Sequence, residues 1–141
     1  MNSIPEIKVA FSTTIDSAID FAHEKSNIIN SDSSTIINYK NIGIVYFIYV
    51  LNKKDKSTSL VYIGKSKGHL FKTRIRNHFY KKHPKTGSKL SKVQDELTKG
   101  NGLGLKFLKV SPESFRNTLE EELINHFRPI WNIQKKSSLN K

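Results

Sequence analysis

Residues 43–51, which read GIVYFIYVL, restrict the fold of this chain more than any other segment. After Gly43 every side chain is β-branched, aromatic or leucine, and such a run is typical of a strand that is buried on both faces. The polar segment NKKDKSTS at 52–59 predicts a hairpin loop, and LVYIG at 60–64 predicts the returning strand, which we expect Gly64 to end. The centre of the fold is therefore expected to be an antiparallel hairpin.

Helical patterns surround this hairpin. Apolar residues at helical spacing predict a helix over residues 11–25, with Thr13 and Asp16 as a capping pair at its start. The elements predicted after the hairpin are helices at about 70–80 and 88–99, a strand at about 103–110, and a helix that runs from its cap Ser111 and first residue Pro112 to Phe127. We therefore expect an α/β (α+β) fold in which a small three-stranded antiparallel sheet is flanked by helices in the order ββααβα, with an N-terminal helical extension.

Length and composition place the hairpin and most helices in one domain. The chain has 141 residues, of which 36% are hydrophobic, which suffices for one core but not two. The predicted divisions are a helical extension and linker (1–40), the main domain (41–134) and a basic tail (135–141). The absence of cysteine excludes disulfides, thiolate zinc sites and a thiol nucleophile. Because no apolar run approaches the roughly 18 residues of a membrane helix and the start lacks signal-peptide features, we expect a cytoplasmic (intracellular) protein that does not enter membranes.

Positive charge is concentrated after the first 40 residues. The chain carries 24 Lys and Arg against 12 Asp and Glu, a net charge of +12. Residues 1–40 hold three lysines and five acidic residues, a balance of −2, which leaves 21 basic and seven acidic residues, a balance of +14, in residues 41–141. Because such an excess repels itself, a polyanionic partner is expected, with nucleic acid favoured over a membrane surface and over a charge that serves only solubility.

Glu120 is the acidic residue whose place in a predicted helix points to chemistry. The apolar stripe of the last helix is formed by Leu119, Leu123, Ile124 and Phe127. At about 100° per residue Glu120 lies at the edge of that stripe, whereas Glu121 and Glu122 fall well outside it. A carboxylate that faces the core is unfavourable unless it is paired, hydrogen-bonded or bound to a metal. Arg116 also faces inward one turn earlier, so a structural ion pair between Arg116 and Glu120 is the alternative to a functional site.

Three tyrosines and one cationic pair are weaker candidates when each is taken by itself. Tyr46, Tyr49 and Tyr62 lie in the predicted strands, where tyrosine is common for packing reasons. Arg74 and His78 are four residues apart and share one face of a predicted helix. A pair of this kind is usually surface charge.

Together these residues resemble the GIY-YIG nuclease family over about residues 43–134. The matching motifs, in order, are the hairpin GIVYF…VYIGKS, Arg74 with His78, Glu120 followed by LI, and a PxxN motif that ends at Asn132. The ending RPIWNIQKK is especially similar to the phage endonuclease II group. In the first motif Ile44 and Val45 replace the usual Gly-Ile, so the matching tyrosine is Tyr46, with Tyr49 as the weaker alternative.

The resemblance implies a Mg²⁺-dependent DNA endonuclease of phage, mobile-element or restriction type, with Mn²⁺ as a substitute metal. The catalytic residues that it implies are Tyr46, Tyr62, Arg74, His78, Glu120 and Asn132. Glu120 would hold one divalent metal ion, and Tyr46 or Tyr62 would be the general base. Arg74 would clamp a phosphate oxygen, His78 would assist the base, and Asn132 would fix the surrounding groups. Since an ordinary tyrosine pKa of about 10 suits a base poorly, Lys65, Arg74 and the metal are expected to favour the phenolate.

Basic residues around the second motif are expected to hold DNA. The predicted DNA-binding residues are Gly64, Lys65, Lys67, Lys72, Arg76, Lys81, Lys82 and Lys85. Gly64 would let the backbone turn close to a phosphate, and the lysines would contribute affinity with little sequence information. Because cutting two strands with one small centre usually needs two protomers, a homodimer or tetramer is expected. The rival hypothesis is a non-catalytic nucleic-acid-binding module, which would not require Glu120.

Overall fold

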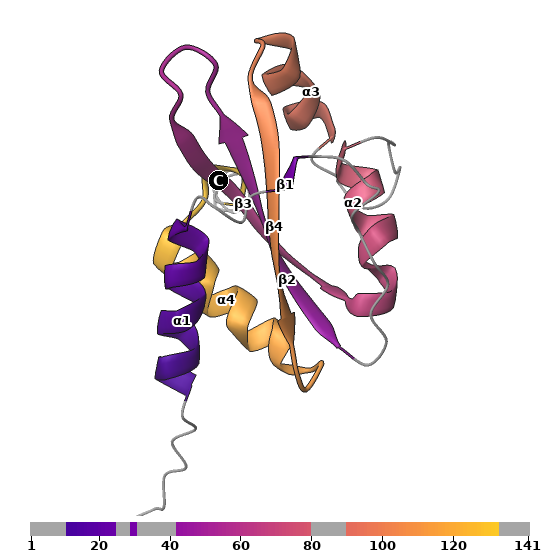
Figure 1. Ribbon diagram of the computed structural model, residues 1–141. Coiled ribbons are helices and arrows are strands. Elements are labelled where there is room, and N and C mark those ends of the chain that lie inside the picture. Colours follow the sequence, from indigo (N-terminus) through magenta and orange to yellow (C-terminus); the bar gives the residue numbers. More distant parts are fainter. Residues whose placement is uncertain (1–10, 25–28, 31–41, 80–89, 133–141) are drawn as a thin grey trace, which may run out of the picture.

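The computed structural model describes residues 11–24, 29–30, 42–79 and 90–132. Its centre is an antiparallel sheet in which β2 (Gly43–Leu51) lies between β3 (Thr58–Lys67) and β4 (Gly102–Val110). The other elements are α1 (Phe11–His23), β1 (Ile29–Asn30), η2 (Gly68–Leu70), α2 (Phe71–Phe79), α3 (Leu90–Thr98) and α4 (Phe115–Phe127). The three predicted strands and the order ββααβα are confirmed, and the short β1 adds a fourth strand to the sheet beside β4 (Figure 1). In the described part of the chain, none of the helices has the length and apolar character needed to span a bilayer.

Helices cover both faces of the sheet (Figure 1). Successive side chains of a strand point to opposite faces, so β2 contributes to two cores. The core on the α2 and α3 side contains Ile44, Tyr46, Ile48, Phe71, Ile75, Val93 and Trp131. The core on the α1 and α4 side contains Ala18, Ala22, Val45, Phe47, Tyr49, Leu119 and Leu123. All of β2 except its last residue is buried, which confirms the prediction of a strand buried on both faces.

A bulge in β3 changes which side chains face α2 and α3. A register shift between Ile48 and Tyr49 of β2 leaves Val61 as an extra residue in β3. Val61 and Tyr62 consequently both contact the core on the α2 and α3 side. The extra residue of a bulge interrupts the alternation of side chains between the two faces of a sheet. Tyr62, the partner of Ile48, lies on the face of Tyr46 by the regular pairing, and the bulge adds Val61 to the same face.

Helix α4 begins later than predicted. Its first residue is Phe115, so Ser111 does not cap it and Pro112 is not its first residue. The amide of Phe115 donates to the carbonyl oxygen of Pro112 at 3.0 Å, and the amide of Arg116 donates to the carbonyl oxygen of Glu113 at 3.2 Å. Residues 111–114 therefore form a turn ahead of the helix, and the peptide bond between Ser111 and Pro112 is cis.

The N-terminal part of the chain differs from the prediction in two places. The helix predicted at 11–25 is present as α1, but it begins at Phe11, so Thr13 lies inside it and does not cap it. The strand β1 was not predicted, and its Ile29 pairs with Leu105 of β4. Two residues are too few to show a strand period. The predicted linker that follows β1 lies outside the described residues.

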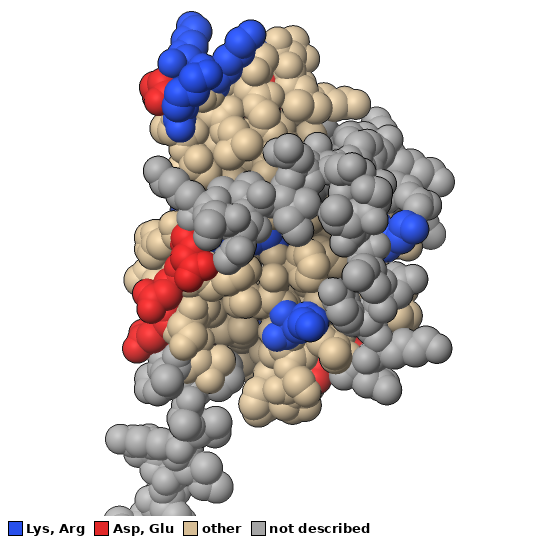
Figure 2. Space-filling model, in the orientation of Figure 1, with Lys and Arg blue, Asp and Glu red and all other residues tan. Residues whose placement is uncertain are grey.

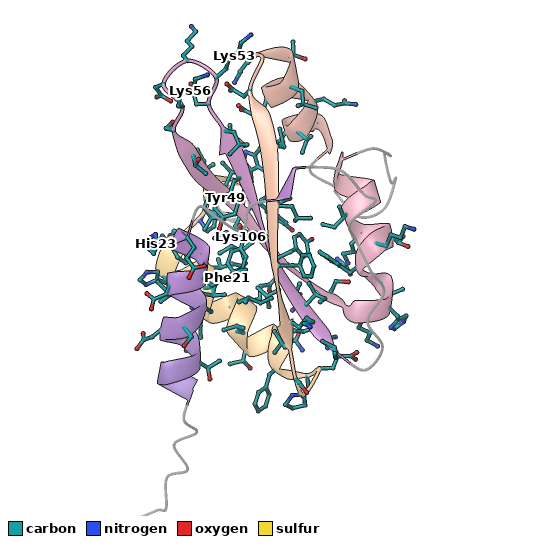
Figure 3. All side chains as sticks on the ribbon, viewed as in Figure 1. Phe21, His23, Tyr49, Lys53, Lys56 and Lys106 are labelled. Carbon is teal, nitrogen blue, oxygen red and sulfur yellow. The ribbon has the colours of Figure 1, made fainter. Side chains whose placement is uncertain are left out.

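The C-terminal end of α1 is fastened to the sheet by two side chains (Figure 3). The Tyr49 hydroxyl donates to the carbonyl oxygen of Ala22 at 2.7 Å. The buried Lys106 of β4 donates from Nζ to the carbonyl oxygens of Phe21 and Glu24, and its ammonium lies 4.8 Å from the Phe21 ring centroid. The last carbonyls of a helix lack hydrogen-bond donors within the helix and carry partial negative charge. An ammonium group there donates to these carbonyls and compensates their charge. Burial lowers the pKa of Lys106, while the nearby Glu24 carboxylate acts in the opposite direction.

Deleting residues 1–24 is expected to lower the free energy of unfolding by at least about 3 kcal/mol, because α1 buries apolar side chains, among them Ala18, Ala22 and Phe21, against the sheet, and the carbonyls of Phe21 and Glu24 accept from Lys106. Chemical denaturation of the two chains measures the difference. As a control, Tyr49→Phe removes one hydrogen bond and should cost only about 1 kcal/mol. Equal stability of the full and shortened chains would contradict this account of α1.

Candidate active site

Two phenols lie together on the α2 side of the sheet. Tyr46 of β2 and Tyr62 of β3 have ring centroids 6.2 Å apart, and a hydrogen bond joins their hydroxyls. The Tyr46 ring also lies 5.6 Å from the Phe71 ring at the start of α2. Tyr46 is only 1% exposed whereas Tyr62 is half-buried, so Tyr62 is the phenol nearer solvent. Tyr49, the weaker alternative to Tyr46, faces α1 on the opposite side of the sheet and does not belong to this pair.

Gly64 makes room for the Tyr46 ring. The two residues are direct partners in the pairing of β2 with β3. A Cβ at position 64 would lie 2.4 Å from both Cζ and Oη of Tyr46, closer than any side chain tolerates. The expectation that Gly64 ends the strand is wrong, because β3 continues to Lys67. The glycine is required by the phenol that covers it, and its contact with a DNA backbone stays a prediction.

Helix α4 presents Glu120 as the helical wheel predicts. Leu119 and Leu123 are buried against the sheet, and Glu121 and Glu122 are exposed. The Glu120 side chain lies between these extremes at 16% exposed. One of the three consecutive glutamates therefore points toward the sheet, on the edge of the apolar face.

Glu120 is paired with a residue that the sequence did not suggest. Its Oε1 lies 3.6 Å from Nζ of Lys65 on β3. The alternative partner, Arg116, instead bonds the carbonyl oxygen of Glu113 at 3.0 Å and lies 3.9 Å from the Glu113 carboxylate. Lys65 had been assigned to DNA binding and to favouring a phenolate, but not to Glu120. Its place beside the Gly64 that Tyr46 covers puts it on the other face of β3, toward α4, and that alternation is the signal that could have identified the pair.

Arg74 and Glu120 both act electrostatically on the two phenols. Burial raises the pKa of Tyr46 well above its ordinary value; Tyr62 and Glu120 add to the rise and Arg74 opposes it. Burial also raises the pKa of Tyr62, with Glu120 adding to the rise and Arg74 and the hydrogen bond with Tyr46 opposing it. Arg74 thus favours both phenolates, as expected, but in the protein without a metal ion burial outweighs its effect. These interactions nevertheless bring the exposed Arg74 of α2 and Glu120 of α4 to the same two phenols.

The Glu120 carboxylate is itself perturbed by its surroundings. Burial raises its pKa, whereas the ion pair with Lys65 and the charge of Arg74 act to lower it. The net direction is upward, so the site favours the protonated acid more than water does. A cation that replaced Lys65 beside Glu120 would favour the ionised form.

Asn132 fixes the strand segment between the site residues. Its Nδ2 donates to the carbonyl oxygen of Ile63 at 3.0 Å, and the Ile63 amide donates to its Oδ1 at 3.0 Å. Ile63 lies between Tyr62 and Gly64 on β3, which is the edge strand of the sheet. The side-chain amide thus takes the place of a neighbouring strand at this point and holds the backbone from which Tyr62 projects.

Several predicted residues lie beyond what the structure describes. His78 and Arg76 belong to α2, but their side chains are outside the described residues, as are Lys81, Lys82 and Lys85 altogether. Of the remaining predicted DNA contacts, Lys67 and Lys72 are exposed on β3 and α2.

A single carboxylate of this kind suits a divalent metal that keeps most of its own water. The described residues contain no group of three or more His, Asp or Glu side chains that could cage a metal ion. Mg²⁺ commonly binds through only one or two carboxylates together with waters and substrate phosphates. The Glu120 carboxylate is a hard oxygen donor, and its partner Lys65 is 39% exposed and can turn toward solvent. The donor chemistry therefore fits Mg²⁺ or Mn²⁺ at Glu120.

The site and the sheet that supports it define a class of protein. A carboxylate, a guanidinium and two phenols drawn from four elements around the edge strand of a small α/β domain form the kind of polar centre that hydrolases of phosphate esters use. A family model for the GIY-YIG catalytic domain matches residues 43–135, and the chain belongs to this family of nucleases. The match covers every site residue named above and leaves α1 outside it. A search of curated proteins found no match.

Proposed function

We propose that this protein is a DNA endonuclease that hydrolyses phosphodiester bonds with Mg²⁺, for which Mn²⁺ can substitute. The observation that carries the proposal is that Glu120 and Arg74 act on both Tyr46 and Tyr62, although the four side chains come from four different elements. A half-buried carboxylate repels the phosphates of a polyanion, so a module that only bound DNA would gain nothing from Glu120.

Each of the two charged residues has a role that its position supports. The exposed Arg74 guanidinium would hold a nonbridging oxygen of the scissile phosphate, for which its planar donors are suited. A divalent cation bound by Glu120 would supply positive charge at that phosphate and its leaving oxygen. Asn132 would keep the Tyr62 segment in place through the backbone of Ile63.

Tyr62 is the better placed of the two phenols to accept a proton from the attacking water. It is nearer solvent than Tyr46, and the hydrogen bond with Tyr46 lowers its pKa against the effect of burial. Tyr46, for which that same bond raises the pKa, would serve as the donor that orients Tyr62. His78 would assist this base from α2.

The charge distribution supports DNA as the substrate. Exposed Lys67 and Lys72 flank the site, and the other predicted lysines follow α2 in the sequence. Acidic side chains, which include Asp16, Asp20 and Glu24, are instead exposed along α1 (Figure 2). The ending RPIWN supports a place in the phage endonuclease II-like group. Two or four protomers acting in the cytoplasm would allow both strands to be cut.

Incubation with supercoiled plasmid DNA tests the proposal. We expect nicked or linear products with Mg²⁺ or Mn²⁺ and none in excess EDTA, with activity restored when the metal is added back. Gel electrophoresis measures the products, and sequencing of the ends gives the position of cleavage. Cutting that persists in EDTA would overturn the metal requirement. Binding without cleavage in either metal would favour the non-catalytic module instead.

A further inference from the structure

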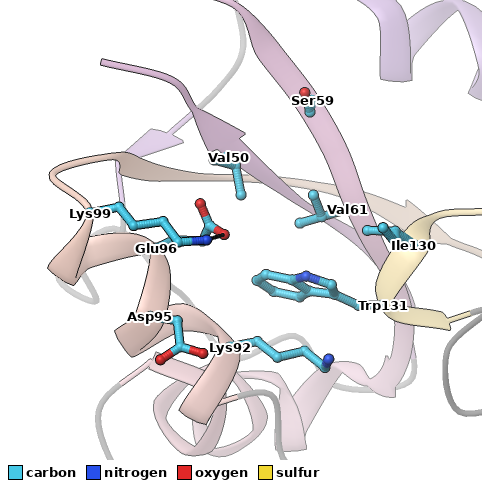
Figure 4. A pocket seen from close by; sticks show the side chains of 9 residues that line it. All are labelled: Val50, Ser59, Val61, Lys92, Asp95, Glu96, Lys99, Ile130 and Trp131. Atoms are coloured by element: carbon cyan, nitrogen blue, oxygen red, sulfur yellow. Dashed lines mark ion pairs between the residues drawn. The ribbon is translucent and has the colours of Figure 1, made fainter. Parts of the chain in front are cut away.

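A pocket of about 420 Å³ lies between the β2–β3 hairpin, α3 and the segment 130–131 (Figure 4). Two of its lining residues immediately precede site residues in the chain: Val61 precedes Tyr62 on β3, and Trp131 precedes Asn132. Adjacent residues of a strand are only about 3.3 Å apart along it. A group in the pocket would therefore be a near neighbour of a phosphate held at Tyr62.

The floor of the pocket is apolar. Val50 and Val61 of the hairpin and the Trp131 indole are buried there, and the Ile130 side chain at the rim is 55% exposed. Aliphatic and indole surface of this kind favours a flat apolar face over a phosphate. The volume lies within the range of about 300–1,000 Å³ that is usual for small-molecule sites.

The rim of the pocket carries charges of both signs that cancel. Lys92 and Lys99 contribute two positive charges, and Asp95 and Glu96 contribute two negative ones. The Glu96 carboxylate lies 3.5 Å from Nζ of Lys99 and accepts a hydrogen bond from the Asn101 amide at 2.9 Å. A lining with no net charge does not select an anion. It does present donors and acceptors around an apolar floor, which suits a neutral, planar ring with polar edges.

Exposed lysines lie beyond the pocket, at a place suited to phosphates that are linked to such a ring. Lys53, Lys54 and Lys56 are exposed at the tip of the β2–β3 hairpin (Figures 2 and 3). The tip is fixed to the end of α3, because the Lys53 amide donates to the Asn101 side chain at 3.0 Å. Along β3 the pocket therefore lies between the candidate active site and the hairpin tip, where three exposed lysines outnumber one exposed acid, Asp55.

We propose that this pocket receives one unstacked nucleobase of the nucleic-acid substrate, next to the phosphate that is cleaved. The inference rests on the proposed function and extends it. The base lies on the Trp131 and Ile130 surface, its edge meets the charged rim, and the flanking phosphates lie toward Lys67 on one side and the hairpin lysines on the other. Single-stranded DNA is the preferred probe, because its bases need not be unpaired first.

The single tryptophan of the chain makes the pocket directly observable. In EDTA, which prevents cleavage, Trp131 emission is followed while the protein is titrated with a single-stranded oligonucleotide of about ten nucleotides. A phosphodiester chain of the same length without bases is titrated in parallel, and anisotropy of a labelled end measures the affinity of each. We expect the oligonucleotide with bases to quench Trp131 emission saturably, and the abasic chain to bind without quenching.

A pocket-filling variant provides the second measurement. Ser59→Phe places a ring at the pocket wall, and Ser91→Phe places the same ring on the exposed surface of α3 away from the lining. Stacking of one base contributes about 1–3 kcal/mol. We therefore expect Ser59→Phe to lower the affinity for the oligonucleotide roughly tenfold and to leave the affinity for the abasic chain unchanged. Ser91→Phe should behave as the unmodified protein.

The outcomes separate this inference from the proposed function. If the oligonucleotide and the abasic phosphodiester bind equally tightly and neither alters Trp131 emission, the proposed base site is wrong while nucleic-acid binding stands. If Ser59→Phe and Ser91→Phe weaken binding alike, the base site is also wrong. If neither the oligonucleotide nor the abasic phosphodiester binds, the proposed base site and the proposed nucleic-acid substrate are both wrong.

Discussion

We expect Glu120→Gln to lower the rate of DNA cleavage in Mg²⁺ roughly 10³-fold while DNA affinity stays the same or rises slightly. The glutamine keeps the shape of the side chain but removes the charge that would hold the metal beside Tyr62 and Arg74. Affinity does not fall, because the phosphates are held by exposed lysines and the lost charge repelled them. Single-turnover cleavage and anisotropy titration measure the two quantities separately.

The same helix offers a matched control. Glu121→Gln removes an identical charge from an exposed position one residue away, and we expect cleavage within about twofold of the unmodified protein because surface charges contribute little. Equal losses of cleavage activity in Glu120→Gln and Glu121→Gln would mean that Glu120 acts only through its contribution to the net charge of α4, and not as a specific site residue. Full activity in Glu120→Gln would remove it from the site.

A stability measurement on metal-free protein gives Glu120 a second, independent test. Burial raises the pKa of Glu120 in the folded state, so its contribution to stability is present below the ordinary glutamate pKa of about 4.3 and is lost as the pH rises through the raised value. At neutral pH in EDTA we therefore expect Glu120→Gln to unfold at a higher temperature than the unmodified protein, and the gain to shrink toward pH 4. Lys65 is exposed enough to be hydrated without its partner.

The sequence predicted the sheet, the order of its elements and the inward glutamate because each depends on a local pattern. An uninterrupted apolar run identifies β2, and a 3.6-residue period separates Glu120 from Glu121 and Glu122. These patterns are read within one element, so they do not depend on how the chain folds back on itself.

What the sequence did not show depends on contacts between elements. The bulge at Val61 is a property of the pairing between β2 and β3, and nothing in the residues 60–64 alone reveals it. The pair between Lys65 and Glu120 required knowledge of which face of β3 meets α4. The start of α4 was also misplaced, because Ser and Pro at 111–112 carry helix-start signals that the following turn overrides.

Gly64→Ala should lower cleavage by roughly 100-fold and the free energy of unfolding by about 1–3 kcal/mol. The added Cβ would meet the Tyr46 ring at 2.4 Å, and that ring cannot swing away because it is buried beside Tyr62 and Phe71. Either Tyr46 or β3 must shift, and both movements disturb the hydrogen bond between the two phenols. Chemical denaturation and single-turnover cleavage measure the two effects.

Two further variants decide whether the Tyr46 ring is the cause. Gly102→Ala on β4 adds the same methyl group where the nearest atoms, in Leu51, lie at an ordinary 3.6 Å, so we expect little change in stability or cleavage. Tyr46→Leu, combined with Gly64→Ala, removes the ring that the new methyl group would strike. The double variant should therefore be more stable than additive losses predict, by a coupling of about 1 kcal/mol or more, while remaining inactive. Strict additivity of the two losses would show that Gly64 is needed for some reason other than the phenol above it.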